Sequence, residues 1–335
     1  MNFGGTIRVN RFGLLLICCL LILFIYYLSP SSPPEDEPKV NLRRVLMAAL
    51  AAAERGGKEV LKGTTQSLGT QSKGETKEGV NIPVTDADYN SHCVMYYGIA
   101  KMFPFVKVIS EEKEGEKKCT NLQTFELDDK ALGDLLDEDV LAADVAVWID
   151  PLDATKEYTE KKYEYVTTMV CVSHRGKPII GVIHKPFGEE PKTSWAWLNN
   201  GMSPNLKVVD DKTGDNSHDV LVSISHAGKV EKLIEPIFGS SAKLVAAAGS
   251  GYKTLEVAVG NATAYIHSTD ISKWDICAGD AILTATGGHF SSLKGDPIDY
   301  SSNSPSLHSM GVLAARNKYP DYLANAKKNP LTRGT

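Results

Sequence analysis

The sequence lacks several features that mark common classes of protein. Its 335 residues carry a formal net charge of −5, so the basic excess typical of nucleic-acid-binding proteins is absent. It contains no heptads, no internal repeat and no P-loop motif of the form G-x-x-x-x-G-K-[ST]. The composition, 42% hydrophobic and 23% charged, is that of a globular protein. We therefore expect one large domain or two small ones, and no nucleic-acid partner.

The cysteines form no C-x-x-C pair, which argues against a zinc site. Two of the six, Cys18 and Cys19, lie in an apolar run near the N-terminus. A secretory compartment would permit disulfides among the other four, but their spacing does not give the pairing. These four are scattered along the chain: Cys93, Cys119, Cys171 and Cys277.

The one long apolar run, LLLICCLLILFIYYL, occupies residues 14–28. Together with the two residues before it, this run is long enough for a short transmembrane helix. The alternative is a cleaved signal peptide, but no small-residue cleavage site follows the run. Two arginines precede the run and no basic residue follows before Lys39, so the positive-inside rule places the large domain in a lumen. The predicted parts are a cytosolic tail (1–11), a transmembrane signal anchor (12–28), a linker (29–39) and a folded domain (40–330).

Helical and strand patterns alternate through the folded domain. The polar, glycine-containing segment 64–84 is predicted to be a mobile loop, and the charged segment 126–142 a helical insertion. The interleaving predicts a mixed α/β fold built in layers. Helices are predicted over 40–63, 85–103, 229–238 and 274–288, and strands over 105–112, 144–150, 219–225 and 262–268, with a hairpin over 165–186.

Four acidic residues stand where such a fold brings side chains together. Each alone could be a helix cap or a solvated turn residue. Converging carboxylates, however, repel one another unless cations lie between them. Oxygen ligands without thiols or clustered imidazoles favour magnesium. Each of the four ends a predicted strand, opens a turn or begins a helix: Glu111, Asp150, Asp153 and Asp275.

Four segments resemble motifs of the inositol monophosphatase superfamily, in the order found there. WIDPLDATKEY (148–158) is similar to the first signature, W-x-D-P-[LI]-D-[GSA]-T-x-x-[FY], and KWDICAGDAIL (273–283) to the second. ISEE (109–112) and PVTDAD (83–88) resemble two further segments. The resemblance covers about residues 40–320 and implies the sugar-phosphatase fold of that superfamily, an αβαβα sandwich.

The resemblance also implies a magnesium-dependent mechanism with two or three Mg²⁺ ions. Asp88 would hold a further, weaker metal ion or help to position the nucleophilic water. Thr155 would pair with a carboxylate, expected to be Glu111, and would relay the proton of that water. The ions would hold the phosphoryl oxygens and stabilise the leaving oxygen, so no covalent enzyme intermediate is needed. The implied metal ligands are Glu111, Asp150, the backbone carbonyl of Leu152, Asp153 and Asp275.

Within the superfamily, the chain most resembles the lithium-sensitive 3′-nucleotidases that act on adenosine 3′,5′-bisphosphate. VSISHAG (222–228) and AAGSGYK (247–253) are similar to two of their segments, and Lys253 would be the cation for the 5′-phosphate. The chain departs from the family pattern at Ser110, which replaces a glycine, and at Ile224, which replaces an arginine. The implied substrate-binding residues are Ser223, His226, Gly249, Lys253 and Asp275.

The anchor makes the chain similar to a membrane-anchored Golgi member of this group. The resemblance then implies a single-pass type II Golgi protein whose lumenal domain releases AMP and phosphate and so supports sulfation. A homodimer is common in the family. A phosphatase of inositol phosphates and an inactive anchored binding module are the alternatives. The triplet Asn261-Ala262-Thr263 is a sequon that a lumenal domain would expose to glycosylation.

Overall fold

The structure is a computed structural model. Contacts within the chain separate residues 1–38 from residues 39–335, and the fold described here is that of the second unit. The predicted tail at 1–11 and part of the predicted anchor at 12–28 lie outside the described residues. The described residues are 37–65, 69–77, 79, 81–113, 119–120, 123–127, 132–133, 135–206, 218–224 and 230–330, with 15, 17–22 and 24.

Across these residues we find no helix with both the length and the apolar character needed to cross a membrane.

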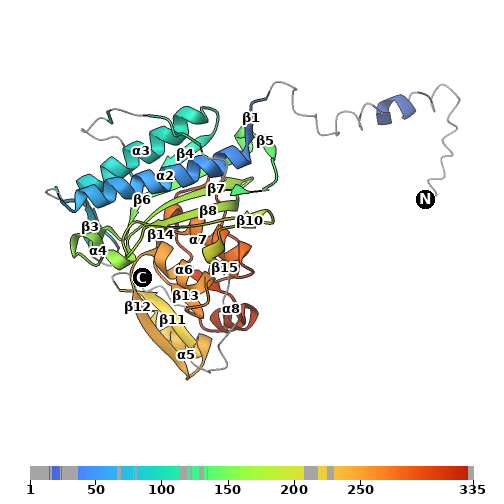
Figure 1. Cartoon of the computed structure of the whole chain (residues 1–335). Helices are drawn as coiled ribbons and strands as arrows, with labels where there is room; N and C mark the ends of the chain where they lie inside the picture. The colour runs from blue at the N-terminus through green and yellow to red at the C-terminus, as the bar shows by residue number, and fades with distance from the viewer. Residues whose placement is uncertain are drawn as a thin grey trace, which may run out of the picture. The chain divides into compact units, whose positions relative to one another are not determined.

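Five layers make up residues 39–335, in the order helices, sheet, helices, sheet, helices (Figure 1). A pair of long helices covers one face of the first sheet, and a second pair lies between the two sheets. Two short helices cover the outer face of the second sheet. The mixed α/β class and the αβαβα arrangement predicted from the sequence are therefore confirmed.

The first sheet has six strands in the order β10-β9-β8-β7-β6-β4, and all neighbours are antiparallel except β4 and β6. Every residue of β6 is buried, because α2 and α3 cover one face of the sheet and α7 covers the other. The strands are β4 (Lys107–Ser110), β6 (Val145–Asp153), β7 (Thr167–His174), β8 (Lys177–Lys185), β9 (Lys192–Trp197) and β10 (Gly201–Met202).

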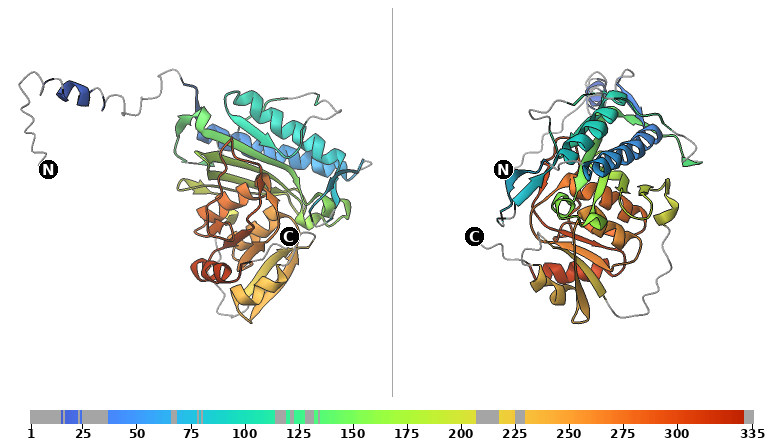
Figure 2. Two further views of the ribbon diagram at one scale, coloured as in Figure 1. Left: turned by 180° about the vertical axis from the view of Figure 1, so that it is seen from behind. Right: turned by 60° about the vertical axis from the view of Figure 1, so that its left-hand side comes forward.

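The two outer helices, α2 (Leu42–Gly63) and α3 (Asp86–Met102), pack side by side across this sheet, as the turned view in Figure 2 shows. Small residues on α2 let them approach closely. A Cβ on Gly56 would collide with the side chain of Met95 on α3, so glycine is required there although it weakens an isolated helix. A capping box at Thr85 begins α3, which ends before Pro104 as predicted.

The second sheet has five strands in the order β12-β11-β13-β17-β15. β12, β11 and β13 are parallel, so their carboxyl ends meet at one edge of the sheet. The strands are β11 (His218–Ser223), β12 (Ala242–Ala247), β13 (Ala264–His267), β15 (His289–Ser291) and β17 (Val312–Ala315). The helices are α6 (Ser250–Ala258) and α7 (Lys273–Ala285) between the sheets, with α5 (Glu231–Phe238) and α8 (Tyr319–Lys328) outside.

Two local predictions were wrong. The segment 64–84 is not only a loop: it contains the hairpin of β2 (Gln71–Glu75) and β3 (Asn81–Val84). The segment 126–142 shows no α-helix in its described residues, because β5 (Asp139–Leu141) pairs with β1 (Lys39–Asn41) instead. Two further short strands, β14 (Ile271–Ser272) and β16 (Leu307–His308), pair beside α7, and the short helix α4 (Thr155–Thr159) follows β6.

Two disulfides link the four scattered cysteines. Cys93 on α3 pairs with Cys119, across 26 residues of chain. Cys171 on β7 pairs with Cys277 on α7, across 106 residues, and both sulfurs belong to buried side chains. The second bridge therefore ties the first sheet to the helix that separates it from the second.

Candidate active site

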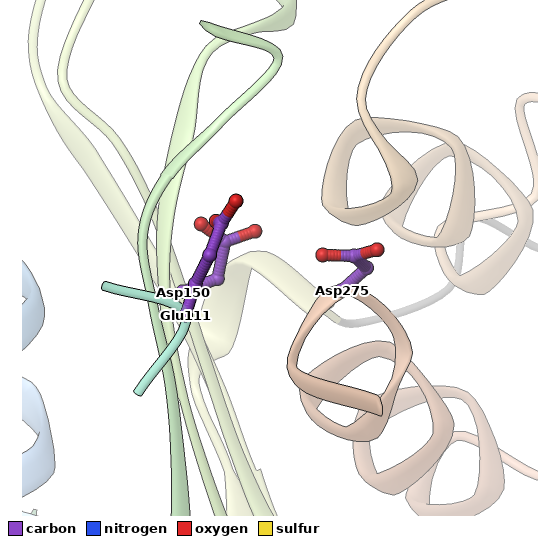
Figure 3. Close-up of side chains that lie close together, drawn as sticks. All are labelled: Glu111, Asp150 and Asp275. Atoms are coloured by element: carbon purple, nitrogen blue, oxygen red, sulfur yellow. The ribbon is translucent and has the colours of Figure 1, made fainter. Parts of the chain in front are cut away.

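Two neighbouring strands of the first sheet end at the same place and each presents one carboxylate. β4 and β6 run parallel, with Ser110 paired to Ile149. The next residues on the two strands are Glu111 and Asp150, which therefore lie side by side (Figure 3). The backbone N–H of Glu111 donates to the carbonyl of Ile149 at 3.1 Å, and this bond extends the pairing to the acidic residues.

A third carboxylate faces these two from α7. Asp275 is the third residue of the helix, and the N–H of the capping residue Ser272 donates to it at 3.1 Å, which fixes the side chain. Figure 3 shows Asp275 opposite the pair on the strands. One oxygen of each of Glu111, Asp150 and Asp275 lies within 4.8 Å of the others. Residues 125 positions apart in sequence are thus brought to one small space.

The electrostatics of this cluster favour a bound cation. Burial raises the pKa of Asp150 and of Asp275 well above the usual value, and the nearby Glu111 carboxylate raises both further. Neither carboxylate is stable as an anion here without a compensating positive charge. Three carboxylates at this spacing, with no thiol or imidazole among them, form a donor set that fits Mg²⁺ or a similar hard cation.

Asp153, the fourth predicted ligand, lines the same cavity but stands slightly apart from the cluster. Its Oδ2 accepts the backbone N–H of Gly251 at 2.8 Å and the hydroxyl of Thr167 at 3.3 Å. A register shift in β6 between Asp150 and Asp153, followed by Ala154 with φ of 67°, turns the chain at this point. The turn places the two aspartates of the signature along one wall of the cavity.

Thr155 was predicted to pair with Glu111, and this prediction was wrong. Its hydroxyl lies 2.9 Å from Oδ1 of Asp88 and 3.0 Å from the backbone carbonyl of Leu152. Asp88 is fully buried in the first turn of α3, where its Oδ2 accepts both the N–H and the hydroxyl of Thr85. Burial raises the pKa of Asp88 to about 6, which suits a group that takes up and releases a proton.

The hairpin of β2 and β3 brings a lysine to the cluster that the sequence did not indicate. Lys73 of β2 lies 2.9 Å from Oε1 of Glu111 and also contacts Glu112. Burial alone would lower the pKa of Lys73, but the two glutamates together raise it above its usual value. At the turn of the hairpin, Lys77 forms an ion pair with Asp270, which follows β13. The hairpin therefore contacts both sides of the cavity.

The cavity has a volume of about 550 Å³ and extends from the carboxylates to the second sheet. Ser223 lies at the end of β11, and the loop after β12 contributes Gly249, whose φ of 66° suits glycine. Lys253 on α6 is 2% exposed, and burial lowers its pKa to about 8 despite the nearby anions of Asp153 and Glu157. The predicted residue His226 lies outside the described residues.

The chain is similar to known proteins over most of its length. A family model, described as the Inositol monophosphatase family, matches residues 41–328. The chain belongs to the inositol monophosphatase family. It is therefore a phosphatase of a metal-dependent family.

The similarity extends over most of the folded domain. The chain is 46% identical over 296 residues to a Drosophila melanogaster protein provisionally named inositol monophosphatase 3, covering 87% of this chain and 82% of that protein. It is 41% identical over 276 residues to the Golgi-resident adenosine 3′,5′-bisphosphate 3′-phosphatase of Mus musculus, covering 79% and 75%. The crystal structure of the extragenic suppressor protein suhB from Bartonella henselae shares the fold, with a TM-score of 0.63 and 16% identity over 86% of this chain and 100% of that one.

Three cavity residues of this family member were missed by the sequence analysis. Glu157 on α4 is 5% exposed, and Tyr265 and His267 on β13 are 0% and 4% exposed. Glu157 lies within the first signature, at one of its variable positions, so its nearness to Asp153 and Thr155 in sequence was a signal that could have been used. Tyr265 and His267 gave no signal, because an alternating strand pattern does not say which face meets a cavity.

The departures from the family pattern have local explanations. The Ser110 hydroxyl and Nδ1 of His92 share a hydrogen bond of 2.8 Å. Ile224 is 43% exposed at the rim of the cavity. Asp280, the extra acid of the second signature, is a buried residue of α7 that accepts a hydrogen bond from the hydroxyl of Tyr300 at 3.0 Å. Burial raises the pKa of Asp280 to about 7.

Proposed function

We propose that the protein is a magnesium-dependent phosphatase that hydrolyses the 3′-phosphate of adenosine 3′,5′-bisphosphate to give AMP and phosphate. One observation carries the choice of substrate: the buried cation of Lys253 lines the same cavity as the carboxylates. A cation held in that position suits a second phosphate, which a monophosphate does not have. The name of the Mus musculus relative agrees with this substrate.

The carboxylates supply the part of the site that would hold metal. Bound Mg²⁺ would neutralise the phosphoryl oxygens and the leaving 3′-oxygen. The raised pKa values of the buried aspartates imply that protons are released when cations bind. The ligands would be the carboxylates of Glu111, Asp150, Asp153 and Asp275 and the backbone carbonyl of Leu152.

Thr155 and Asp88 would handle the proton of the attacking water. The Thr155 hydroxyl donates to Asp88, so its lone pairs are directed away from Asp88 and can accept a proton from water. As that proton arrives, the hydroxyl proton passes to Asp88. The water oxygen then forms a bond to phosphorus, the bond from phosphorus to the 3′-oxygen breaks, and the 3′-oxygen takes up a proton from a second water molecule.

At the other end of the substrate, Lys253, Ser223, Gly249 and His226 would hold the 5′-phosphate and the ribose. Asp275 would contact both a metal ion and the substrate, since it belongs to the carboxylate cluster and lines the cavity. Glycine at position 249 lets this loop pass close to the backbone of Tyr165, because a Cβ there would lie 2.7 Å from the carbonyl oxygen of Tyr165.

A second candidate function is the hydrolysis of inositol phosphates. The family description and the provisional name of the Drosophila melanogaster relative favour it. An inactive binding module is a weaker alternative, because every residue expected to bind metal is present.

Phosphate release distinguishes these functions. The purified full chain is supplied with adenosine 3′,5′-bisphosphate, its sulfated precursor, adenosine 3′-monophosphate and inositol monophosphates, with and without Mg²⁺ and with lithium. We expect Mg²⁺-dependent, lithium-sensitive turnover with kcat/KM highest for the bisphosphate. A higher kcat/KM for inositol monophosphate would favour the second function, and no turnover of any substrate would favour the binding module.

We also propose a type II anchor at residues 12–28, with the folded domain in the Golgi lumen, where it would remove the by-product of sulfation. The two disulfides suit an oxidising lumen. Asn261 is exposed after α6, so a lumenal domain would carry a glycan there. A mass decrease on glycosidase treatment that Asn261→Gln abolishes would support this topology. Light scattering of the purified chain would test the predicted homodimer.

A further inference from the structure

We propose that Tyr265 and His267 on β13, together with the hydroxyls of Ser223 and Ser250, form the subsite that recognises the second phosphate of the substrate. This inference rests on the proposed function, because it assigns a position to the 5′-phosphate of a bisphosphate. It adds two specificity-determining residues that neither signature of the family contains.

The topology of the second sheet brings these residues together. β11 and β13 are parallel neighbours, with Leu221 beside Tyr265, so Ser223 at the end of β11 lies beside His267 at the end of β13. Tyr265 and His267 are two residues apart on one strand and therefore point to the same face. That face borders the cavity, at the edge of the sheet where parallel strands present their carboxyl ends.

Two long contacts join the four side chains of the cluster in pairs. Oγ of Ser223 lies 3.5 Å from Nδ1 of His267, and the hydroxyl of Tyr265 lies 3.5 Å from Oγ of Ser250. Both distances are at the outer limit of a hydrogen bond. All four side chains are at most 9% exposed, so their polar atoms have little access to bulk water. Hydroxyls buried at the wall of a cavity can donate hydrogen bonds to a ligand that enters it.

The orientation of the imidazole is fixed from the other side. Nε2 of His267 lies 2.9 Å from the hydroxyl of Thr269 and 3.4 Å from the backbone carbonyl of Asp270. The opposite edge of the ring, with Nδ1, faces Ser223. A ring that carries its proton on Nδ1 would donate to a phosphate oxygen placed there.

Lys253 supplies the charge that makes this cluster selective for an anion. Its Nζ lies 5.0 Å from the centre of the Tyr265 ring, so the ammonium group and the hydroxyl cluster belong to one region of the cavity. Hydroxyl and imidazole donors around one lysine match the three terminal oxygens of a phosphate monoester. The carboxylate cluster lines another part of the same 550 Å³ cavity, so one molecule with two phosphates can occupy both.

The test compares a substrate that has the second phosphate with one that lacks it. Tyr265→Phe removes only a hydroxyl, and His267→Asn removes the imidazole while it keeps a polar side chain. For each variant, kcat and KM are measured on adenosine 3′,5′-bisphosphate and on adenosine 3′-monophosphate. We expect KM for the bisphosphate to rise about 10-fold or more, as for a lost hydrogen bond to a charged group, with kcat nearly unchanged. The kinetic constants for the monophosphate should stay within about twofold.

Two control variants and one binding measurement accompany the test. Tyr322→Phe on α8 and His184→Asn on β8 change the same residue types at buried positions that do not line the cavity. Inhibition by AMP, which carries the 5′-phosphate, is compared with inhibition by adenosine. In the wild type AMP should inhibit more strongly, and in both cavity variants its advantage should fall about 10-fold, although the controls leave it unchanged.

Three results would overturn the proposal. If both cavity variants keep the wild-type preference for the bisphosphate and for AMP, the second phosphate binds elsewhere, and the proposed function stands. If the monophosphate loses as much activity as the bisphosphate, the residues are structural. If the wild type itself shows no preference for the bisphosphate, the proposed function fails, and the subsite fails with it.

Discussion

The two sheets contribute to the site in different ways. The first sheet presents anionic side chains from strand ends that are enclosed by helices on both faces, and its strand β6 is buried throughout. The second sheet presents hydroxyls, an imidazole and a glycine-containing turn at the ends of parallel strands, and its edge strand β12 is largely exposed. The carboxylates that would bind a cation thus follow strands of the sheet that helices cover on both faces. The groups that would select the substrate follow or lie on strands of the sheet with an exposed edge strand.

The largest effect is expected from the bridge that ties the first sheet to α7. In a chain-entropy treatment, a disulfide that closes a loop of about 100 residues contributes about 4–5 kcal/mol. Removal of the Cys171–Cys277 bridge by a double alanine substitution should lower the free energy of unfolding by that amount. The Cys93–Cys119 bridge closes a shorter loop, so the matched double variant should lose about 1 kcal/mol less. Urea denaturation of both variants would measure the difference, and a larger loss from the shorter loop would contradict this view.

The next effect separates the chemistry of the two sheets. Asp275→Asn keeps the size of the side chain but removes one charge from the cluster. We expect kcat/KM to fall at least about 100-fold, about 3 kcal/mol, on every substrate, with a weaker dependence on Mg²⁺ concentration. The variants at Tyr265 and His267 should affect only bisphosphates. Equal losses on both substrate classes from both sets of variants would remove the distinction between the two ends of the cavity.

A smaller effect is expected at the helix between the sheets. Because the pKa of Asp280 is raised to about 7 in the folded protein, the folded state binds a proton that the unfolded state has released between about pH 4 and 7. The contribution of Asp280 to the free energy of unfolding is therefore fully present below about pH 4 and is lost as the pH rises through about 7. The Asp280→Asn variant should have the same free energy of unfolding as the wild type near pH 4. At pH 8 it should be more stable by about 2 kcal/mol, which is about half of the value that the full pKa shift gives, because the folded protein relaxes around the charge. Thermal unfolding across this range would show it, and a variant equally destabilised at every pH would refute it.

The smallest effect on activity is expected from the hairpin of β2 and β3, which contacts both sides of the cavity. Lys77→Met removes its ion pair with Asp270, on the side of the second sheet, and leaves the contact of Lys73 with Glu111. Lys77 is 74% exposed, and exposed ion pairs contribute at most about 1 kcal/mol. We expect KM for the bisphosphate to change no more than about fivefold, with less change at high salt. Hydrogen exchange of β2 and β3 should rise slightly. A loss of kcat would instead indicate that the hairpin takes part in the chemistry.

The two sheets also differ in how far the sequence predicted them. The signatures at 148–158 and 273–283 combine acids, a proline and glycines at fixed spacing, and they predicted the carboxylate end before any geometry was known. The partner of Thr155 was missed, because the choice between Asp88 and Glu111 depends on how α3 crosses the sheet. The lysine at position 73 was missed because its strand is polar and exposed on both faces, so no period-2 pattern marked it.

The second sheet gave weaker signals. Its strands were found, but the face of β13 that carries Tyr265 and His267 depends on long-range pairing with β11 and not on local composition. The disulfide pairing could not be read either, since Cys171 and Cys277 meet only once α7 has packed on β7. Local chemistry was therefore predictable, and contacts between distant segments were not.

The position of α7 between the sheets restricts how a protein of this shape can acquire new specificity. Its first turn holds Asp275, its middle carries Cys277, and Asp280 is enclosed one turn later. A substitution on any side of this helix is transmitted to one sheet or the other. Divergence of substrate choice should therefore accumulate outside this helix, at the strand ends of the second sheet and in the turns that follow them, while the sequence of α7 changes little.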